Sequence, residues 1–294
     1  MQTDSNNNHS FSDTSKHKHT AKDPLVGSSA VANVWEDMLN SSYDPSQTTP
    51  IKLKGRVGKK AKTAAVIVAG GSANRFKHDG GKQMFELLGK PILTWSIEAF
   101  DSVVDVGYIV VVSPDERREE YIANAIKPYS FVTPIAFASS GGIRQESAMN
   151  GIDAVPQEYE TIAIHDGARP LVTPDLIQHA INELKGDLDL DGVVVGHPSI
   201  DTLKVVENDH IVGTPNRHMF WVAQTPQIFR ADICRRAYST AMFEGFVGTD
   251  DSTLVERLGA RVCMVNAPRD NIKVTVPEDI GPAAAALKAR VGSK

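Results

Sequence analysis

AAVIVA (64–69) opens a regular series of short apolar runs and longer amphipathic stretches, which goes on with PILTWSIEAF (91–100), VGYIVVVS (106–113) and DERREEYIANAIK (115–127). This series predicts strand, helix, strand and helix. The alternation continues through PIAFAS (134–139), QESAMNGIDAV (145–155), TIAIHD (161–166), PDLIQHAINEL (174–184) and DGVVVGHP (191–198). Because the strand-like runs are rich in Val and Ile on both faces, we expect an α/β fold with a mostly parallel sheet flanked by helices.

After residue 198 the rhythm changes. In DTLKVVENDHIVGTPNR (201–217), two short strand-like pieces flank Asn208 and Asp209, which is a hairpin signal. We expect a β-hairpin at about 199–217. Because an isolated two-stranded ribbon with so few apolar residues needs another surface to lie on, the hairpin either folds back on its own domain or protrudes and packs against another subunit. The strand-like ARVCMVNA (260–267) and the helix-like PEDIGPAAAALKARV (277–291) then resume the first pattern, so residues 63–294 are predicted to form one domain.

Residues 1–62 differ from the rest in composition. They are rich in Ser, Asn and Lys, poor in large apolar residues, and hold nine Lys and Arg residues against six Asp and Glu. The remainder holds 22 against 30 and is acidic. We expect a disordered, polar and basic N-terminal tail, because such a segment buries too little apolar surface to offset the entropy of ordering.

Composition excludes several classes of protein. The 294 residues carry a formal net charge of −5, which argues against a nucleic-acid binder. Only two cysteines occur, so a disulfide framework or a cysteine-rich metal site is excluded and a cytoplasmic location is expected. No apolar run approaches the roughly 18–20 residues that span a bilayer, and the N-terminus lacks a secretory signal. We therefore expect no membrane partner.

Two loops at the ends of predicted strands carry candidate chemistry. AGGSANRFKHDGGKQ (69–83) is lean enough for backbone N–H groups to approach an anion, yet it matches neither a Walker A loop nor a dinucleotide fingerprint. Phosphate binding and a plain strand-to-helix turn both stay open. In IHDGARPLVTPD (164–175), Asp166 and Arg169 either hold a ribose, metal or phosphate, or pair with each other; His165 is interpreted as structural.

Seven blocks together resemble one enzyme family. They are AGGSANR…GKQ, GGIRQES, HDGARPLV, DTLK, RHMFWVAQTPQIF, GTDDSTLVE and DNIKVTVPEDI. In this order they are similar to the 2-C-methyl-D-erythritol 4-phosphate cytidylyltransferases, over about residues 63–290. The resemblance implies a Rossmann-like fold and transfer of CMP from CTP to methylerythritol phosphate, with Mg²⁺, in non-mevalonate isoprenoid synthesis. It also implies a homodimer whose hairpin serves as a dimerisation arm.

The resemblance assigns roles by position. Arg75, Lys82 and Lys273 match catalytic cations at the α-phosphate. The matching CTP-binding positions are Ala69, Gly70, Gly71, Gly141, Gly142, Arg144, Ser147, Asp166 and Gly167. Those on the side of the polyol phosphate are Arg169, Thr202, Arg217, Thr225 and Thr249, with Thr202 and Arg217 reaching across to the partner's site. The resemblance implies that Mg²⁺ is held mainly by the CTP phosphates rather than by protein side chains, with Asp166 as a candidate ligand.

The match has departures. Gly81 stands where the family usually has proline, Ala73 replaces a frequent glycine and Gly167 replaces a frequent alanine, so the order of the first loop without ligand is open to question. One alternative is a ribitol-5-phosphate cytidylyltransferase, although ARPLV and DTLK are more similar to the methylerythritol enzymes. Another is an inactive nucleotide-binding regulator, against which the joint presence of Arg75, Lys82, Asp166 and Lys273 argues.

Overall fold

The structure is a computed structural model that describes residues 61–71 and 81–291. Nearly all of the predicted N-terminal tail lies outside the described residues, as does the predicted catalytic Arg75. None of the helices within the described ranges is long and apolar enough to cross a membrane.

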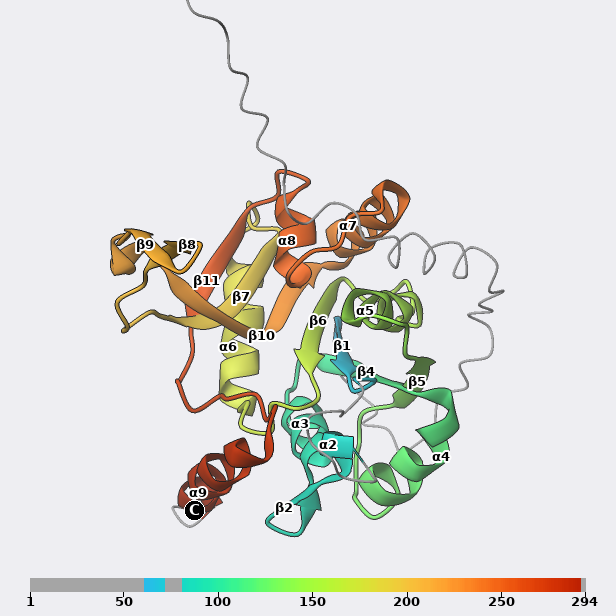
Figure 1. Cartoon of the computed structure of the whole chain (residues 1–294). Helices are drawn as coiled ribbons and strands as arrows, with labels where there is room; N and C mark the ends of the chain where they lie inside the picture. Colours follow the sequence, from blue (N-terminus) through green and yellow to red (C-terminus); the bar gives the residue numbers. More distant parts are fainter. Residues whose placement is uncertain (1–60, 72–80, 292–294) are drawn as a thin grey trace, which may run out of the picture. The chain divides into compact units, whose positions relative to one another are not determined.

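A seven-stranded sheet forms the centre of the domain, in the order β11-β7-β10-β6-β1-β4-β5 (Figure 1). Its strands are β1 (Thr63–Val68), β4 (Val106–Ser113), β5 (Ile135–Ser139), β6 (Thr161–Asp166), β7 (Gly192–Pro198), β10 (Trp221–Arg230) and β11 (Val262–Asn266). The pairs β5–β4, β4–β1, β1–β6 and β7–β11 are parallel. The predicted mostly parallel α/β sheet is therefore confirmed.

β10 is antiparallel to its two neighbours in the sheet. It pairs antiparallel with both β6 and β7, and the sequence pattern predicted no element there. Proline is rare in a central strand because it cannot donate to the ladder. Here Pro226 falls in a register shift between Ala223 and Gln227, where the pairing with β7 is interrupted. The strand accommodates the proline by leaving the ladder locally.

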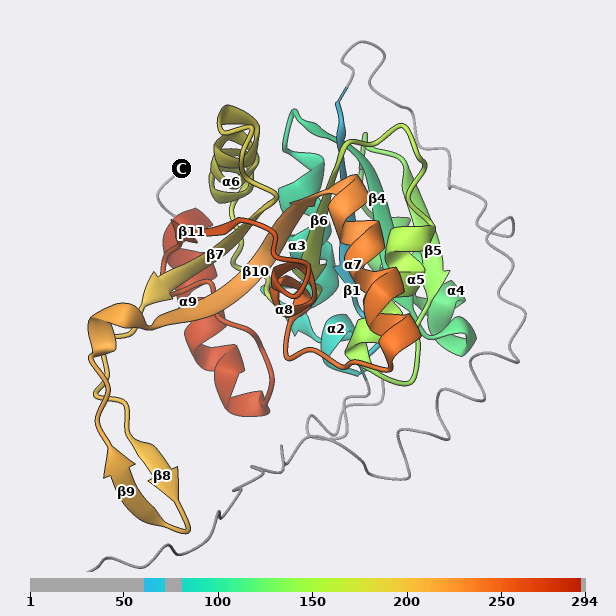
Figure 2. The same ribbon diagram turned by 90° about the horizontal axis from the view of Figure 1, so that it is seen from above.

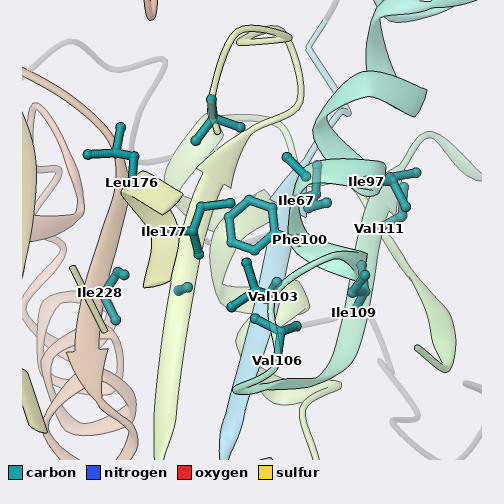
Figure 3. Close-up of a cluster of buried hydrophobic side chains, with 14 of the residues drawn as sticks. Ile67, Ile97, Phe100, Val103, Val106, Ile109, Val111, Leu176, Ile177 and Ile228 are labelled. Atoms are coloured by element: carbon teal, nitrogen blue, oxygen red, sulfur yellow. The ribbon is translucent and has the colours of Figure 1, made fainter. Parts of the chain in front are cut away.

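The two faces of the sheet are covered by different helices. In β1, Ala65 and Ile67 pack on the side of α3 (Ile92–Asp101) and α6 (Pro174–Gly186), whereas Ala64 and Val66 pack on the side of α5 (Arg144–Asp153) and α7 (Ala231–Glu244). This follows from the period of two along a strand. Figure 3 shows Ile67, Ile97, Phe100 and Ile177 in the cluster of the α3 and α6 face.

Smaller elements complete the domain. They are α2 (Gly81–Met84), β2 (Glu86–Leu87), β3 (Lys90–Pro91), η2 (Asp115–Arg117), α4 (Arg118–Tyr121), η3 (Ile122–Ile126), η4 (Arg217–Met219), α8 (Asp251–Glu256), η5 (Pro277–Asp279) and α9 (Ile280–Val291). A third apolar cluster joins Leu87, Leu171 and Val274 to Ala283 and Leu287 of α9. It links segments that follow Lys82, Arg169 and Lys273 in the sequence.

The predicted hairpin is present, and its role as a dimerisation arm stays a prediction. β8 (Val205–Glu207) and β9 (His210–Gly213) pair antiparallel in a sheet of their own. Between them Asn208 and Asp209 have φ values of 46° and 65°, as a tight hairpin turn requires. The hairpin extends away from the seven-stranded sheet (Figure 2), and all residues of its strands except Gly213 are exposed.

Candidate active site

Asp166 lies at the centre of the candidate site, at the carboxyl end of β6. The register of the parallel pair places Asp166 opposite Val68, the last residue of β1. The loop that begins with Ala69 therefore leaves the sheet directly beside Asp166. In parallel sheets this edge is where ligands bind.

Three cations surround the Asp166 carboxylate. Arg144 Nε donates to Oδ1 at 3.0 Å, and Lys273 Nζ lies 2.9 Å from Oδ2. Arg169 Nε is 3.6 Å from Oδ2, while its Nη1 donates to the carbonyl oxygen of Asn271 at 2.8 Å. The predicted pairing of Asp166 with Arg169 is thus one of three ion pairs. Residues from α5, from the turn after β6 and from the segment before α9 converge here.

These three cations stabilise the ionised form of Asp166. Burial would raise the pKa of this carboxyl group, but Arg144, Lys273 and Arg169 together hold it well below its usual range. For Arg169 burial dominates and lowers the pKa, with Asp166 acting in the opposite direction. The site therefore keeps an ionised carboxylate amid an excess of positive charge, which suits anionic ligands.

Thr225 and His165 are buried residues that form a hydrogen-bonded chain to the backbone of Asp166. Thr225, 4% exposed, accepts a hydrogen bond from the Asp166 backbone N–H, and its hydroxyl oxygen lies 3.1 Å from His165 Nδ1. His165 Nε2 lies 3.3 Å from the carbonyl oxygen of Arg169. Burial lowers the pKa of His165 to about 3, so the ring is neutral. His165 is therefore a buried, hydrogen-bonded residue, as a structural role requires, and Thr225 contacts both His165 and the Asp166 backbone.

Arg144 has a second carboxylate partner that the sequence analysis did not single out. Its Nη1 and Nη2 donate to the two carboxylate oxygens of Asp251 at 2.7 and 2.9 Å. Tyr238 of α7 donates its hydroxyl to the same carboxylate. Burial alone would lower the pKa of Arg144, but Asp251 and Asp166 raise it. The block GTDDSTLVE contained Asp251, yet only its position in three dimensions distinguishes it from Asp250, which caps α8.

The loop before α5 is ordered by its own side chains. Gly141 donates its N–H to Ser147 Oγ at 3.0 Å, and Gly142 donates to Glu146 Oε2 at 2.6 Å. A Cβ atom on Gly141 would lie 2.3 Å from the Cβ of Glu146, so only glycine fits. Likewise a Cβ on Gly70 would lie 2.2 Å from that of Ser140. The two predicted CTP-binding loops are therefore in close contact.

The first loop is described only at its ends. Ala69 donates its N–H to Val112 and accepts from the Tyr121 hydroxyl, so its backbone belongs to the sheet. Gly167 similarly donates to Val68. At the other end, Gly81 has φ of +65°, a left-handed conformation that proline cannot adopt. The departure at Gly81 thus suits its backbone conformation, and Lys82 follows in the first turn of α2.

Three predicted substrate-binding residues are exposed. Thr202 and Arg217 lie at the base of the hairpin, where Arg217 Nη1 donates to the carbonyl oxygen of Ile200 at 2.9 Å. Thr249 lies in the α7–α8 loop and its hydroxyl is 3.1 Å from that of Thr253. Within the described ranges, no group of three or more His, Cys, Asp or Glu side chains could hold a metal ion.

Comparison with known proteins identifies the family. The family model for 2-C-methyl-D-erythritol 4-phosphate cytidylyltransferase matches residues 63–289. The chain belongs to this family. A curated member from Caldanaerobacter subterraneus is 41% identical over 218 residues, which are 74% of this chain and 95% of the relative. Another cytidylyltransferase, from Geobacter metallireducens, is 38% identical over 230 residues, 77% of this chain and 98% of the relative.

Solved structures lead to the same family. The 4-diphosphocytidyl-2C-methyl-D-erythritol synthase of Anaerococcus prevotii superposes with a TM-score of 0.67 at 28% identity, over 77% of this chain and 96% of that one. The cytidylyltransferase of Thermus thermophilus gives 0.60 at 25% identity, over 76% and 98%. The predicted resemblance is confirmed both in sequence and in fold.

Proposed function

We propose that this protein transfers CMP from CTP to 2-C-methyl-D-erythritol 4-phosphate and releases pyrophosphate, as a step in isoprenoid precursor synthesis. Family membership over residues 63–289 supports the reaction. The observation that carries it within the structure is the Asp166 cluster, in which one buried carboxylate gathers Arg144, Arg169 and Lys273 beside the first loop. Such a surplus of cations fits a reaction between two phosphates.

The chemistry needs charge neutralisation and alignment. A phosphate oxygen of the polyol attacks the α-phosphorus of CTP, a new P–O bond forms, and the bond to the β-phosphate breaks as pyrophosphate leaves. Because both reactants are anions, fixed cations and backbone N–H groups supply most of the catalysis. In this proposal Arg75, Lys82 and Lys273 neutralise charge at the α-phosphate, while Gly70 and Gly71 cradle the triphosphate.

The cytidine is proposed to lie over the loop before α5 and the start of that helix, at residues 141–147. Gly141, Gly142 and Ser147 are already fixed there by hydrogen bonds, so the loop loses little entropy on binding. Asp166 and Gly167 lie beside it at the edge of β6 and are assigned to the ribose. Arg169, Thr225 and Thr249 complete the substrate side of the proposal. Because Thr225 is buried, its contribution comes through Asp166.

Magnesium is proposed as the cofactor, held mainly by the phosphates of CTP. The protein side chains do not form a metal cage, because Asp166 is the one proposed protein ligand and both of its oxygens already face cations. The CTP phosphates would therefore supply most of the ligands. Mg²⁺ commonly binds through one or two carboxylates and substrate phosphates. When bound, the ion neutralises triphosphate charge. Chelation should abolish turnover and added Mg²⁺ should restore it.

A homodimer in which the hairpin reaches the partner's site is also proposed. The hairpin exposes Val205, Val206, Ile211 and Val212, with exposed fractions of 48–62%. A two-stranded ribbon with such a surface is marginal in water by itself. A second copy of the chain would cover it and would bring Thr202 and Arg217 to the polyol phosphate of the neighbouring site.

Turnover tests the reaction. The full chain is expected to release pyrophosphate from CTP with methylerythritol phosphate and Mg²⁺, and to do so far more slowly with ribitol 5-phosphate. A preference for ribitol 5-phosphate would replace the assigned substrate. CTP binding without turnover of either polyol phosphate would favour an inactive regulator. A Lys82→Ala variant serves as the control for contaminating activity.

Subunit mixing tests the shared site. A Lys82→Ala chain and an Arg217→Ala chain each lack one proposed component, and a mixed dimer contains one site with both components intact. Activity well above either parent after subunit exchange is the expected result. If exchange is verified and activity does not recover, the hairpin does not complete the partner's site.

A further inference from the structure

We propose that Asp251, held by Tyr238, is a positioning residue for catalysis: it fixes Arg144 and thereby aims the Asp166 carboxylate at Lys273. The inference rests on the proposed reaction and assigns a role to residues outside the predicted site. It also gives Arg144 a task different from direct contact with CTP.

The geometry of Arg144 is set by Asp251. A guanidinium group that donates from both Nη atoms to one carboxylate has its plane and its direction fixed. The direction of the Nε–H bond is fixed with this plane, and Nε donates to Asp166 Oδ1. All three guanidinium nitrogens of Arg144 contact carboxylates of the protein. Arg144 therefore links the position of Asp251 to that of Asp166.

Burial makes Asp251 a firm anchor. Its side chain is 1% exposed, whereas that of Arg144 is 32% exposed. A buried carboxylate without its partners would carry a large desolvation cost, so Asp251 strongly favours the arrangement in which Arg144 and Tyr238 both contact it. Tyr238, 2% exposed, adds a donor from α7. The residues that fix the position of Arg144 therefore lie in α7 and α8.

The direction of Asp166 determines the place of Lys273. Arg144 binds Oδ1, which leaves Oδ2 to face Lys273 at 2.9 Å. Rotation of the carboxylate would separate that oxygen from Lys273. Since the Lys273 side chain is 36% exposed and long, the ion pair to Oδ2 restrains it before a phosphate arrives.

The neighbouring residue reinforces the same junction. Gln145 donates from Nε2 to the carbonyl oxygen of Phe246 and accepts from the Gly248 N–H, both at 2.9 Å. Arg144 and Gln145, the first two residues of α5, thus hold the segment from Phe246 to Asp251. This segment carries Thr249, so the loop assigned to the nucleotide and a residue assigned to the polyol phosphate are positioned together.

The test compares three variants of the full chain. Asp251→Asn removes the charged anchor, and Tyr238→Phe removes one hydrogen bond to it. Asp101→Asn is the matched control: Asp101 ends α3 and accepts backbone N–H groups of Val132 and Thr133, away from the carboxyl edge of the sheet. For each we would measure kcat and KM for both substrates, the Kd for CTP alone, and Tm.

Asp251→Asn is expected to lower kcat on the order of 10²-fold, the size of a misplacement of about 1 Å, with a smaller change in the Kd for CTP. Tyr238→Phe should lower kcat several-fold, and Asp101→Asn should lower Tm and leave kcat unchanged. An Asp251→Asn enzyme with wild-type kcat would overturn the inference. If that variant does not fold, wild-type kcat in Tyr238→Phe overturns it instead. Absence of cytidylyl transfer by the wild type would contradict the proposed function, whereas loss confined to the variants would not.

Discussion

The Asp166 cluster and the β8–β9 hairpin distribute polar and apolar groups in opposite ways. The cluster buries charge: Asp166 is 7% exposed and has Arg144, Arg169 and Lys273 around it. The hairpin exposes apolar side chains: Ile211 is 62% exposed and Val206 is 53% exposed. Buried charges are compensated by partners from the same chain. The exposed apolar residues are not covered within the described part of the chain, which is why a second copy is proposed there.

The largest effect is expected from removing a cation of the cluster. Lys273→Ala should lower kcat on the order of 10²–10³-fold, the range for loss of one preorganised electrostatic donor. KM for CTP should change less, because the interaction is strongest in the transition state. Steady-state kinetics of pyrophosphate release measures both.

Lys288→Ala is the matched control, since Lys288 is an exposed lysine of α9. It should leave both constants unchanged. A Lys273→Ala enzyme with a raised KM and normal kcat would mean that Lys273 contributes equally to binding of the ground state and of the transition state. The Asp166 cluster would then be a binding site, and its contrast with the β8–β9 hairpin would be smaller.

A charge on the hairpin should weaken association and should affect activity only through loss of the proposed dimer. Ile211→Lys is expected to weaken the proposed dimer on the order of 10²-fold, because the two isoleucine side chains of a dimer, partly buried already, would together lose burial worth about 3 kcal/mol. Sedimentation over a dilution series would report this. Leu188→Lys, at another exposed apolar residue after α6, is the control. Equal behaviour of the two variants would argue against the hairpin as an interface.

The pH dependence of stability near neutral pH should come from His165, which contacts Thr225 next to the Asp166 cluster. The pKa of His165 falls from an ordinary 6.5 to about 3 on folding, so between these values only the unfolded state binds the proton. The free energy of unfolding should therefore decrease as the pH falls, by about 2 kcal/mol between pH 7 and pH 5 from this group.

Urea unfolding of the wild type and of His165→Gln over this range isolates the contribution. The variant should show the shallower slope. Asp166 adds no slope in this window: its native pKa is lowered, so its stabilising contribution is complete above the ordinary carboxyl range and is lost only in stronger acid. Parallel pH profiles for the two proteins would contradict the assignment of a neutral, buried His165.

The smallest effect is expected in the hairpin turn. Asp209 has φ of 65°, which glycine adopts without strain, so Asp209→Gly should stabilise the hairpin by about 0.5 kcal/mol. Amide exchange in β8 and β9 should slow about twofold, with no change in urea unfolding of the domain. Glu207→Gly, inside β8, should have the opposite effect. If Asp209→Gly also stabilised the whole domain, the hairpin would not be an independent unit.

Much of the fold was predictable from local patterns. Val106–Ser113 and Thr161–Asp166 were predicted as strands with these same bounds, because fully buried strands are recognisable as short runs of Val and Ile. The hairpin followed from Asn208 and Asp209. β10 was not predicted, since Pro226 interrupts its pattern and the register shift that tolerates proline exists only in the sheet.

The candidate site was also partly predictable from the sequence. The motifs identified Asp166, Arg144 and Lys273 as separate residues, and the family match gave them roles. Their convergence on one carboxylate, and the part of Asp251 and Tyr238 in holding Arg144, could not be read from spacing, because these residues come from different layers of the domain.

The sequence by itself determined the alternating pattern of buried strands and amphipathic helices, the hairpin turn and the family, since each depends on residues close together in the chain or on ordered motifs. The tertiary structure alone decided which charges meet. Coulombic attraction and desolvation depend on distance and burial in space, and Asp166 and Lys273 are more than a hundred positions apart in the sequence, so no local pattern records that they form an ion pair.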